Sequence, residues 1–237
     1  MKSTLLIILS LFVFAVANAQ EKDGQNAMYA PFETIITDLN NDSIPDTIAI
    51  SMPPVEGDPG QFRKINISLG TAGRNTFTAK DAWDDIDTTF LKNNANAVKS
   101  KRIFVYKEND TSYIVLFGFT YGSGRDELDV IAVTGSKLIQ LANDNIQNPI
   151  QFADLDNDGK AELICRNDYE IFNTDRKTKG DIGTYSPYMV YKCENVLYLD
   201  KKLSETYNKQ HYVWAGYKYN QHIKVLYPIT GKPQIMK

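Results

Sequence analysis

The sequence predicts an all-β fold, and three observations support this prediction. Short runs rich in Ile, Val, Tyr and Phe recur along the 237 residues, and turn-forming Gly, Pro, Asn or Asp residues separate them. Helical periodicity is scarce outside one segment. Two acidic segments of similar sequence each lie between strand-like runs. We therefore expect antiparallel sheets that are connected by short turns.

The expected strands follow the apolar runs in chain order. They cover residues 34–37, 47–51, 64–69, 102–107, 113–119, 128–134, 137–141, 150–153, 162–165, 188–192 and 196–199. The polar segments 53–60 and 176–183 are expected to be loops. The helix candidate is 81–94, where apolar residues recur at roughly helical spacing, namely Trp83, Ile86, Phe90 and Leu91.

Composition narrows the functional classes. The net charge is −3 and the pI is about 5.5, which argues against a nucleic-acid-binding protein with a concentrated basic face. His211 and His222 are the only two histidines, which excludes most histidine-based zinc sites and leaves little room for a His-dependent catalytic centre. The acidic residues therefore become the main candidates for function.

Residues 1–19 have the pattern of a secretory signal peptide. Lys2 supplies a positive charge, an apolar run covers 5–16, and Ala17 and Ala19 occupy the positions that a signal peptidase reads. The run is shorter than the roughly 20 residues of a spanning helix, and an uncleaved membrane anchor is the alternative. We expect a secreted or periplasmic protein whose mature part, 20–237, forms a single β domain without a membrane span.

The two cysteines, Cys165 and Cys193, both lie in strand-like runs. In an oxidising compartment, neighbouring antiparallel strands could bring them together as a disulfide. Free cysteines are also common in protein cores, so a pair of buried thiols is an equal alternative.

The strongest motif is an acidic nine-residue segment that occurs twice. The first copy is DLNNDSIPD at 38–46 and the second is DLDNDGKAE at 154–162. Both place oxygen-bearing side chains at positions 1, 3, 5 and 9, and calcium prefers six to eight oxygen ligands. The backbone carbonyls of Ile44 and Lys160 would add a ligand at position 7 of each copy. The spacing therefore predicts two calcium loops.

Two other interpretations of these segments are weaker. An EF-hand needs a glutamate at position 12 and flanking helices, but here position 12 is Ala49 or Cys165 and the flanks are strand-like. Metal-free turns rich in Asp and Asn are the simpler alternative. A bare turn, however, has no reason to crowd several like charges into nine residues.

The pattern D-x-[DN]-x-D-[GS]-x-x-[DE] between apolar strands resembles the FG-GAP and VCBS-type repeats. The resemblance implies a small or incomplete β-propeller-like array, in which calcium loops join the first two strands of a blade. It implies repeat units at roughly 28–95, 100–145 and 148–237. It also implies a set of side-chain ligands, namely Asp38, Asn40, Asp42 and Asp46 in the first loop and Asp154, Asp156, Asp158 and Glu162 in the second.

The two copies differ at positions 3 and 6. The second copy has four carboxylates and Gly159 at position 6, where a left-handed backbone is expected. The first copy has Asn40 at position 3 and Ser43 at position 6, and a left-handed non-glycine residue costs about 1–2 kcal/mol. We therefore expect the second loop to bind calcium more tightly.

The remaining candidate residues carry weaker signals. Clustered carboxylates can hydrolyse glycosides, but Asp84, Asp85 and Asp87 suit a solvated face and Asp126 and Glu127 suit a loop ion pair. The C-terminal third is rich in tyrosine. Most of these rings are expected to pack between sheets, and the segment favoured as a ligand surface contains Tyr212, Trp214, Tyr217 and Tyr219.

These observations favour a secreted, calcium-binding β-repeat protein that acts as a binding or interaction module for a protein or glycan. No catalytic constellation accompanies the acidic loops. A secreted hydrolase that uses clustered carboxylates, or a structural surface protein without a specific ligand, are the alternatives.

Overall fold

The computed structural model describes residues 31–51, 62–70, 73–89, 91–92, 95–120, 126–146, 148–175 and 180–236. The signal segment 1–19 and the expected loop 53–60 lie outside the described residues. Within these ranges the chain forms antiparallel strands and one helix, so the all-β fold class is confirmed.

The largest sheet, sheet one, contains nine strands in the order β1-β2-β3-β4-β7-β6-β5, and β8 pairs with both β7 and β9. Its strands are β1 (Pro31–Thr37), β2 (Asp46–Ser51), β3 (Phe62–Leu69), β4 (Gly73–Ile86), β5 (Ala97–Lys99), β6 (Phe104–Glu108), β7 (Thr111–Thr120), β8 (Asp126–Thr134) and β9 (Lys137–Asp144). Along one edge of β7, the first half pairs with β6 and the last residues pair with β4.

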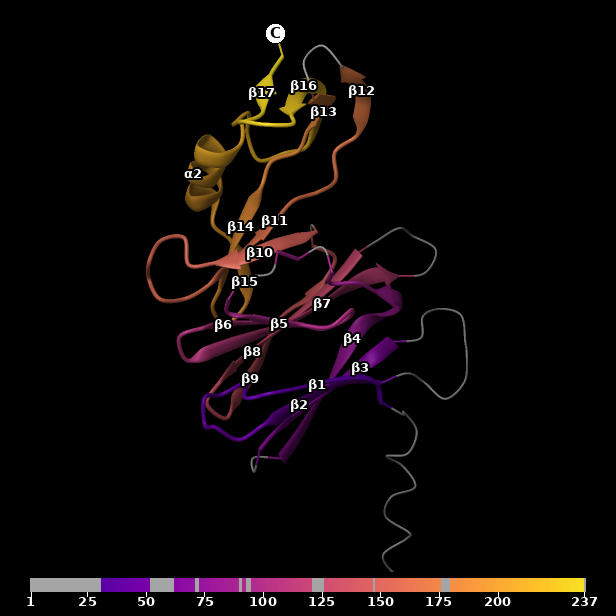
Figure 1. Ribbon diagram of the computed structural model, residues 1–237, viewed down its shortest axis with the longest axis vertical. Coiled ribbons are helices and arrows are strands. Elements are labelled where there is room, and N and C mark those ends of the chain that lie inside the picture. The colour runs from indigo at the N-terminus through magenta and orange to yellow at the C-terminus, as the bar shows by residue number, and fades with distance from the viewer. Residues whose placement is uncertain are drawn as a thin grey trace, which may run out of the picture.

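Two four-stranded sheets follow in the chain. Sheet two has the order β10-β11-β14-β15, with β10 (Pro149–Ala153), β11 (Glu162–Cys165), β14 (Met189–Cys193) and β15 (Leu197–Leu199). Sheet three has the order β12-β13-β16-β17, with β12 (Ile171–Asp175), β13 (Gly180–Tyr185), β16 (Asn220–Pro228) and β17 (Gln234–Ile235). Sheet three lies at the end of the molecule opposite β1 and β2 (Figure 1).

Two apolar cores make β6, β7 and β8 the central layer. One face of these strands packs against β1–β4 through a core that includes Ile48, Ile50, Ile65, Ile67, Trp83, Ile114, Leu116 and Ile131. The other face packs against sheet two through a core that includes Tyr113, Val115, Phe117, Val130, Phe152, Leu163 and Cys165. Burial on both faces explains why these strands have continuous apolar runs.

The prediction of a helix at 81–94 is wrong, because the first residues of this segment belong to β4. Trp83 pairs with Thr120 and Asp85 pairs with Phe119, so Asp84 is an extra residue that forms a bulge. A bulge shifts by one residue the alternation of side chains between the two faces of the sheet. Trp83 and Ile86 are therefore both buried on the same side. The spacing of three residues resembles a helix for this reason.

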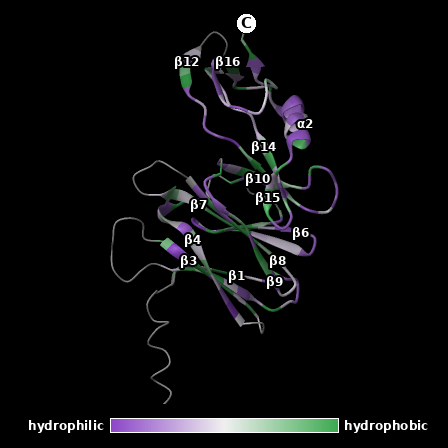
Figure 2. Cartoon of the chain, turned by 180° about the vertical axis from the view of Figure 1, so that it is seen from behind, coloured by the Kyte–Doolittle hydropathy of each residue, from purple (hydrophilic) through white to green (hydrophobic). Residues whose placement is uncertain are grey.

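The helix of the described residues is α2 (Lys201–His211), which was not expected from the sequence. Asp200 caps it by accepting a hydrogen bond from the Leu203 amide at 2.9 Å. Its buried residues are Ser204 and Asn208, which are polar. Figure 2 shows α2 as a largely hydrophilic element, so the usual apolar helical periodicity is missing.

Ser204 and Asn208 hydrogen-bond to the start of β14, beyond the part of that strand that β15 covers. The Val190 amide donates to Ser204 Oγ at 2.9 Å, and the Tyr188 amide donates to Asn208 Oδ1 at 3.0 Å. Asn208 Nδ2 donates to the Tyr188 carbonyl at 2.7 Å. Two side chains of the helix, four residues apart, therefore form hydrogen bonds with backbone groups that the strand edge would otherwise leave unpaired.

Arg166, just after β11, links sheet two to sheet three. Its guanidinium carbon lies 4.6–5.3 Å from the ring centroids of Tyr169, Tyr188, Tyr212 and Tyr227. One guanidinium nitrogen also donates to the Tyr227 hydroxyl at 3.1 Å. Tyr212 is only 1% exposed. It is therefore a core residue and not part of a ligand surface, which corrects one of the sequence-based candidates.

We expect Arg166→Lys to lower the free energy of unfolding by about 2–4 kcal/mol. The reason is that an ammonium group cannot stack on several rings and at the same time donate hydrogen bonds from several nitrogens, as a guanidinium group does. Urea unfolding would measure the change. The control is Lys209→Met, which removes an exposed pair with Glu205 and should cost less than about 0.5 kcal/mol. Equal effects of the two substitutions would contradict the structural role of Arg166.

Candidate metal centre

Both acidic segments lie at the tips of β-hairpins, as the sequence predicts. Loop one, residues 38–46, joins β1 to β2, and loop two, residues 154–162, joins β10 to β11. Position 9 of each loop is the first residue of the second strand. The strand pairing therefore holds position 9 in a defined place relative to position 1.

The carboxylate at position 1 closes each loop in the same way. Asp38 Oδ2 accepts from the Ser43 amide at 3.0 Å, and Asp154 Oδ2 accepts from the Gly159 amide at 3.0 Å. These bonds connect position 1 to position 6 and turn the chain back on itself. The backbone of the two loops therefore folds around equivalent carboxylates.

The carboxylate at position 9 makes a second equivalent bond. Asp46 Oδ2 accepts from the Leu39 amide at 2.6 Å, and Glu162 Oε2 accepts from the Leu155 amide at 2.8 Å. Asp46 and Glu162 are each 1% exposed. A buried carboxylate that accepts from a backbone donor is held in a fixed position at the base of the loop.

The carboxylate at position 5 makes a third equivalent bond, at the tip of each loop. Asp42 Oδ1 accepts from the Ile44 amide at 2.7 Å, and Asp158 Oδ1 accepts from the Lys160 amide at 2.9 Å. Both carboxylates are exposed.

The backbone handedness of the loops also agrees. At position 4, Asn41 and Asn157 have φ values of 60° and 61°. At position 6, Ser43 has a φ of 66° and Gly159 a φ of 84°, which confirms the left-handed conformation expected there. Two segments 116 residues apart thus share both hydrogen bonds and chirality.

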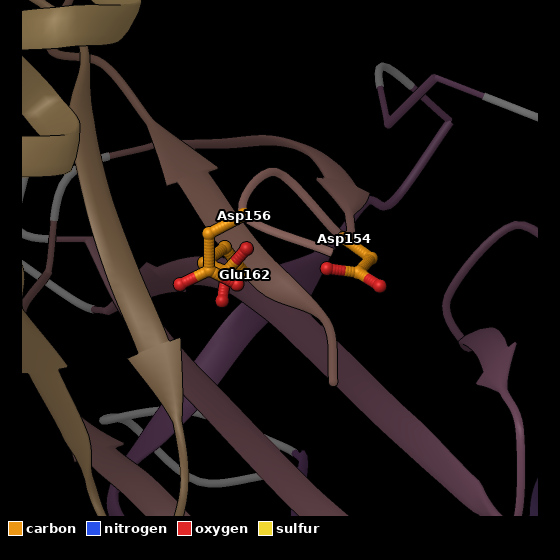
Figure 3. A group of neighbouring side chains, drawn as sticks. All are labelled: Asp154, Asp156 and Glu162. Carbon is orange, nitrogen blue, oxygen red and sulfur yellow. The ribbon is translucent and has the colours of Figure 1, made fainter. Parts of the chain in front are cut away.

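Loop two gathers three carboxylates closely enough to share an ion. One oxygen from each of Asp154, Asp156 and Glu162 lies within 4.8 Å of the others (Figure 3). Burial raises the pKa of the Glu162 carboxyl to about 7, and the Asp156 and Asp158 charges contribute to the rise. An all-oxygen donor set of this kind suits a hard cation such as calcium.

Lys192 on β14 also reaches loop two and was not recognised in the sequence. Its Nζ lies 2.6 Å from Asp156 Oδ2, 3.2 Å from Asp158 Oδ2 and 3.9 Å from Glu162 Oε1. Glu162 and Lys192 are opposite each other in the β11–β14 pairing. Only this register reveals the contact, because 30 residues separate the two in the chain.

The turn between β6 and β7 brings the two loops together. Asn41 Nδ2 of loop one donates to the Asn109 carbonyl at 3.1 Å. Asn109 Nδ2 in turn donates to the Gly159 carbonyl of loop two at 2.7 Å. Lys107 Nζ donates to the Asp38 carbonyl from the end of β6. Both loops therefore occupy the same end of the sheets.

The acidic residues outside the loops do not gather into a cleft in the described structure. Asp84 is exposed, Asp87 is half-buried and bonded to Thr89, and Glu127 is buried and accepts from the Lys80 amide at 2.9 Å. The side chain of Asp126 lies outside the described residues.

A cavity of about 310 Å³ lies beside loop two, and Glu194 is the acidic residue in its lining. The full lining is Thr111, Tyr113, Ala132, Thr134, Lys137, Ile139, Lys160, Cys193, Glu194 and Asn195. None of the carboxylates considered for a hydrolase contributes to it.

The disulfide alternative for Cys165 and Cys193 does not fit the strand register. Both cysteines are free and buried. Cys165 pairs with Met189, so Cys193 lies four residues further along β14, or about 13 Å at roughly 3.3 Å per residue. The Cα atoms of a disulfide are usually within about 7 Å. The structure therefore supports the alternative of two buried thiols.

The rest of the proposed aromatic surface remains accessible in part. Trp214 and Tyr217 are half-buried and pack edge to face with centroids 4.7 Å apart, and Tyr219 is 43% exposed.

No protein-family model matches this chain, and neither a curated protein nor a solved structure shows significant similarity to it. In the part of the chain that the structure describes, no helix combines the length and the hydropathy needed to cross a membrane. Functional inference therefore depends on the geometry of the loops.

We expect Ser43→Gly to stabilise the protein by about 1 kcal/mol, because glycine adopts the left-handed conformation at position 6 without strain. Urea unfolding would measure this gain. The control is Ser136→Gly in the β8–β9 turn, where φ is not positive and the added chain entropy should destabilise the fold. A loss of stability in both variants would contradict the prediction.

We expect Asp129→Asn to stabilise the protein at pH 8. Burial raises the pKa of Asp129 to about 7, Gln140 donates to one carboxylate oxygen, and the other oxygen is buried without a partner. The folded state therefore binds this proton more tightly than the unfolded state, and stability falls as the pH rises from about 4 to 7. The loss amounts to roughly 4 kcal/mol at most.

Urea unfolding at several pH values would test this expectation. Asp129→Asn should remove this part of the pH dependence, whereas Asp144→Asn, on an exposed carboxylate of the same hairpin, should leave it intact. The same pH dependence between pH 4 and 7 in the wild type and in Asp129→Asn would contradict the assignment.

Proposed function

We propose that this protein is a secreted, calcium-stabilised β-repeat protein that serves as a binding or interaction module. One observation carries the proposal. Two acidic loops, far apart in sequence, share the same hydrogen bonds at positions 1, 5 and 9 and the same left-handed residues at positions 4 and 6. This repeated backbone geometry around acidic side chains is typical of a cation-binding loop, and in loop two three of the carboxylates also lie within 4.8 Å of one another.

Calcium explains the loops better than metal-free turns do. Loop one carries three carboxylates and loop two carries four, each within nine residues. Their mutual repulsion raises the energy of the folded loops unless a positive charge offsets it. A divalent ion at the centre would be coordinated by the carboxylate oxygens that accept no backbone hydrogen bond, and water would complete its coordination.

We also propose that the repeats form a small or incomplete propeller-like array, and the arrangement of the sheets supports this. Strands β1–β4 form a meander, β6–β9 form a second meander, and both are packed face to face, with sheet two on the far side of β6–β8. Loops one and two each join the first two strands of their set, as in the FG-GAP and VCBS-type repeats that the motif resembles. The turn at Asn109 occupies the same place in the middle set.

A binding role is proposed because the described acidic residues outside the loops do not form a paired carboxylate cluster. The hydrolase alternative has no support from the described cavity, since its lining lacks a pair of carboxylates. The partly accessible surface of Trp214, Tyr217 and Tyr219 is the candidate contact for a protein or glycan.

We expect calcium to raise the melting temperature by about 3–10 °C at a concentration of roughly 10 mM, since binding to the folded state alone stabilises it by mass action. Differential scanning calorimetry with calcium or with chelator would measure the shift. Magnesium should produce a smaller shift because it requires a tighter octahedral shell.

The matched control is the double variant Asp38→Ala with Asp154→Ala, which lacks the position 1 carboxylate of both loops. It should unfold at the same temperature in calcium and in chelator. A wild-type protein that does not respond to millimolar calcium would overturn the calcium proposal.

A further inference from the structure

Loop two already contains a positive charge that belongs to the chain. The Lys192 ammonium group contacts Asp156, Asp158 and Glu162 at 2.6, 3.2 and 3.9 Å, and its side chain is 15% exposed. It comes from β14, a strand outside the loop, so the contact shows that the loop accommodates a cation.

Loop one lacks this charge at the equivalent position. Thr47 pairs with Ser68 in the β2–β3 ladder, so the neighbouring residue Asp46 lies opposite Leu69, just as Glu162 lies opposite Lys192. Leu69 is a buried core residue. The next amide, Gly70, donates to Asp46 Oδ1 at 2.7 Å instead.

The basic group that reaches loop one is the Lys107 ammonium, which donates to the Asp38 carbonyl and not to a carboxylate. Among the described residues, no lysine or arginine nitrogen lies within 4.0 Å of a loop-one carboxylate oxygen. The two loops are alike in backbone geometry, but in the described part of the chain a lysine contacts the carboxylates of loop two only.

We propose that Lys192 is a tethered cation, which neutralises loop two in place of a metal ion and must be displaced before calcium can bind there. The proposal rests on the calcium function proposed above and specifies how the two loops differ. An ammonium group offers only hydrogen-bond donors, so the oxygens of Asp156 and Asp158 cannot serve it and a calcium ion at the same point.

Displacement of Lys192 is sterically feasible. The side chains of Asp156 and Asp158 are 33% and 36% exposed, so solvent reaches the two carboxylates that Lys192 contacts most closely. The flexible stem of a lysine lets its charged end move into water without a change in the strand. Lys192 thus weakens calcium binding by loop two, whereas its four carboxylates and Gly159 favour binding there.

Calcium titration calorimetry in an Asp38→Ala background isolates loop two and tests this role. Lys192→Met should tighten calcium binding by about tenfold or more, because it removes a competing charge in contact with the ligands. The matched control is Lys160→Met in the same loop, which keeps the backbone carbonyl at position 7 and removes an ammonium group that lies 4.0 Å from Glu194 on a side chain that is 57% exposed. The control should change the affinity by less than about threefold. Equal affinities of the two variants would overturn the displacement proposal.

Melting in chelator tests the neutralising role without any metal. Lys192→Met should lower the melting temperature more than Lys160→Met does, and Lys192→Arg should restore much of the loss because it keeps the charge. Equal melting temperatures for the two methionine variants would overturn the tethered-cation proposal.

The two experiments separate this inference from the proposed function. If no variant binds calcium, the proposed function fails, and the displacement part of this proposal fails with it. The melts in chelator still decide whether Lys192 neutralises the loop.

Discussion

The position of β7 determines most of the remaining structure. It hydrogen-bonds to β6 and β4 along one edge and to β8 along the other. Ile114 and Leu116 face the core shared with β1–β4, whereas Tyr113, Val115 and Phe117 face the core shared with sheet two. A strand that is paired on both edges and buried on both faces fixes the layers around it. The turn that precedes it also sets the place where both acidic loops meet.

The sequence predicted the strands of the central layer and missed those of sheet three. Runs such as 113–117 and 130–133 are apolar because both faces of the strand are covered. Residues 180–183 were expected to be a loop, yet they begin β13. There a Cβ on Gly180 would lie 2.4 Å from the Tyr227 carbonyl oxygen, and one on Gly183 would lie 2.6 Å from that of Glu170. Glycine in this strand reflects close backbone packing and not a turn.

The candidate site was predictable where it depends on local chain geometry. Spacing within nine residues indicated both hairpin loops and the left-handed turn at position 6. Lys192 and Asn109 were missed because they reach the loops from other strands, through a register that the sequence does not display. Tyr212 was misassigned for a similar reason, since a guanidinium group and three neighbouring rings enclose it in the core.

The side chains of Ser204 and Asn208 on α2 have a further effect on how the molecule behaves among its own copies. They occupy backbone groups of Tyr188 and Val190 that a free edge strand would present to any passing chain. Backbone groups that are already bonded to side chains cannot pair with a strand from a neighbouring molecule. The same two side chains thus close the part of the β14 edge that β15 leaves unpaired.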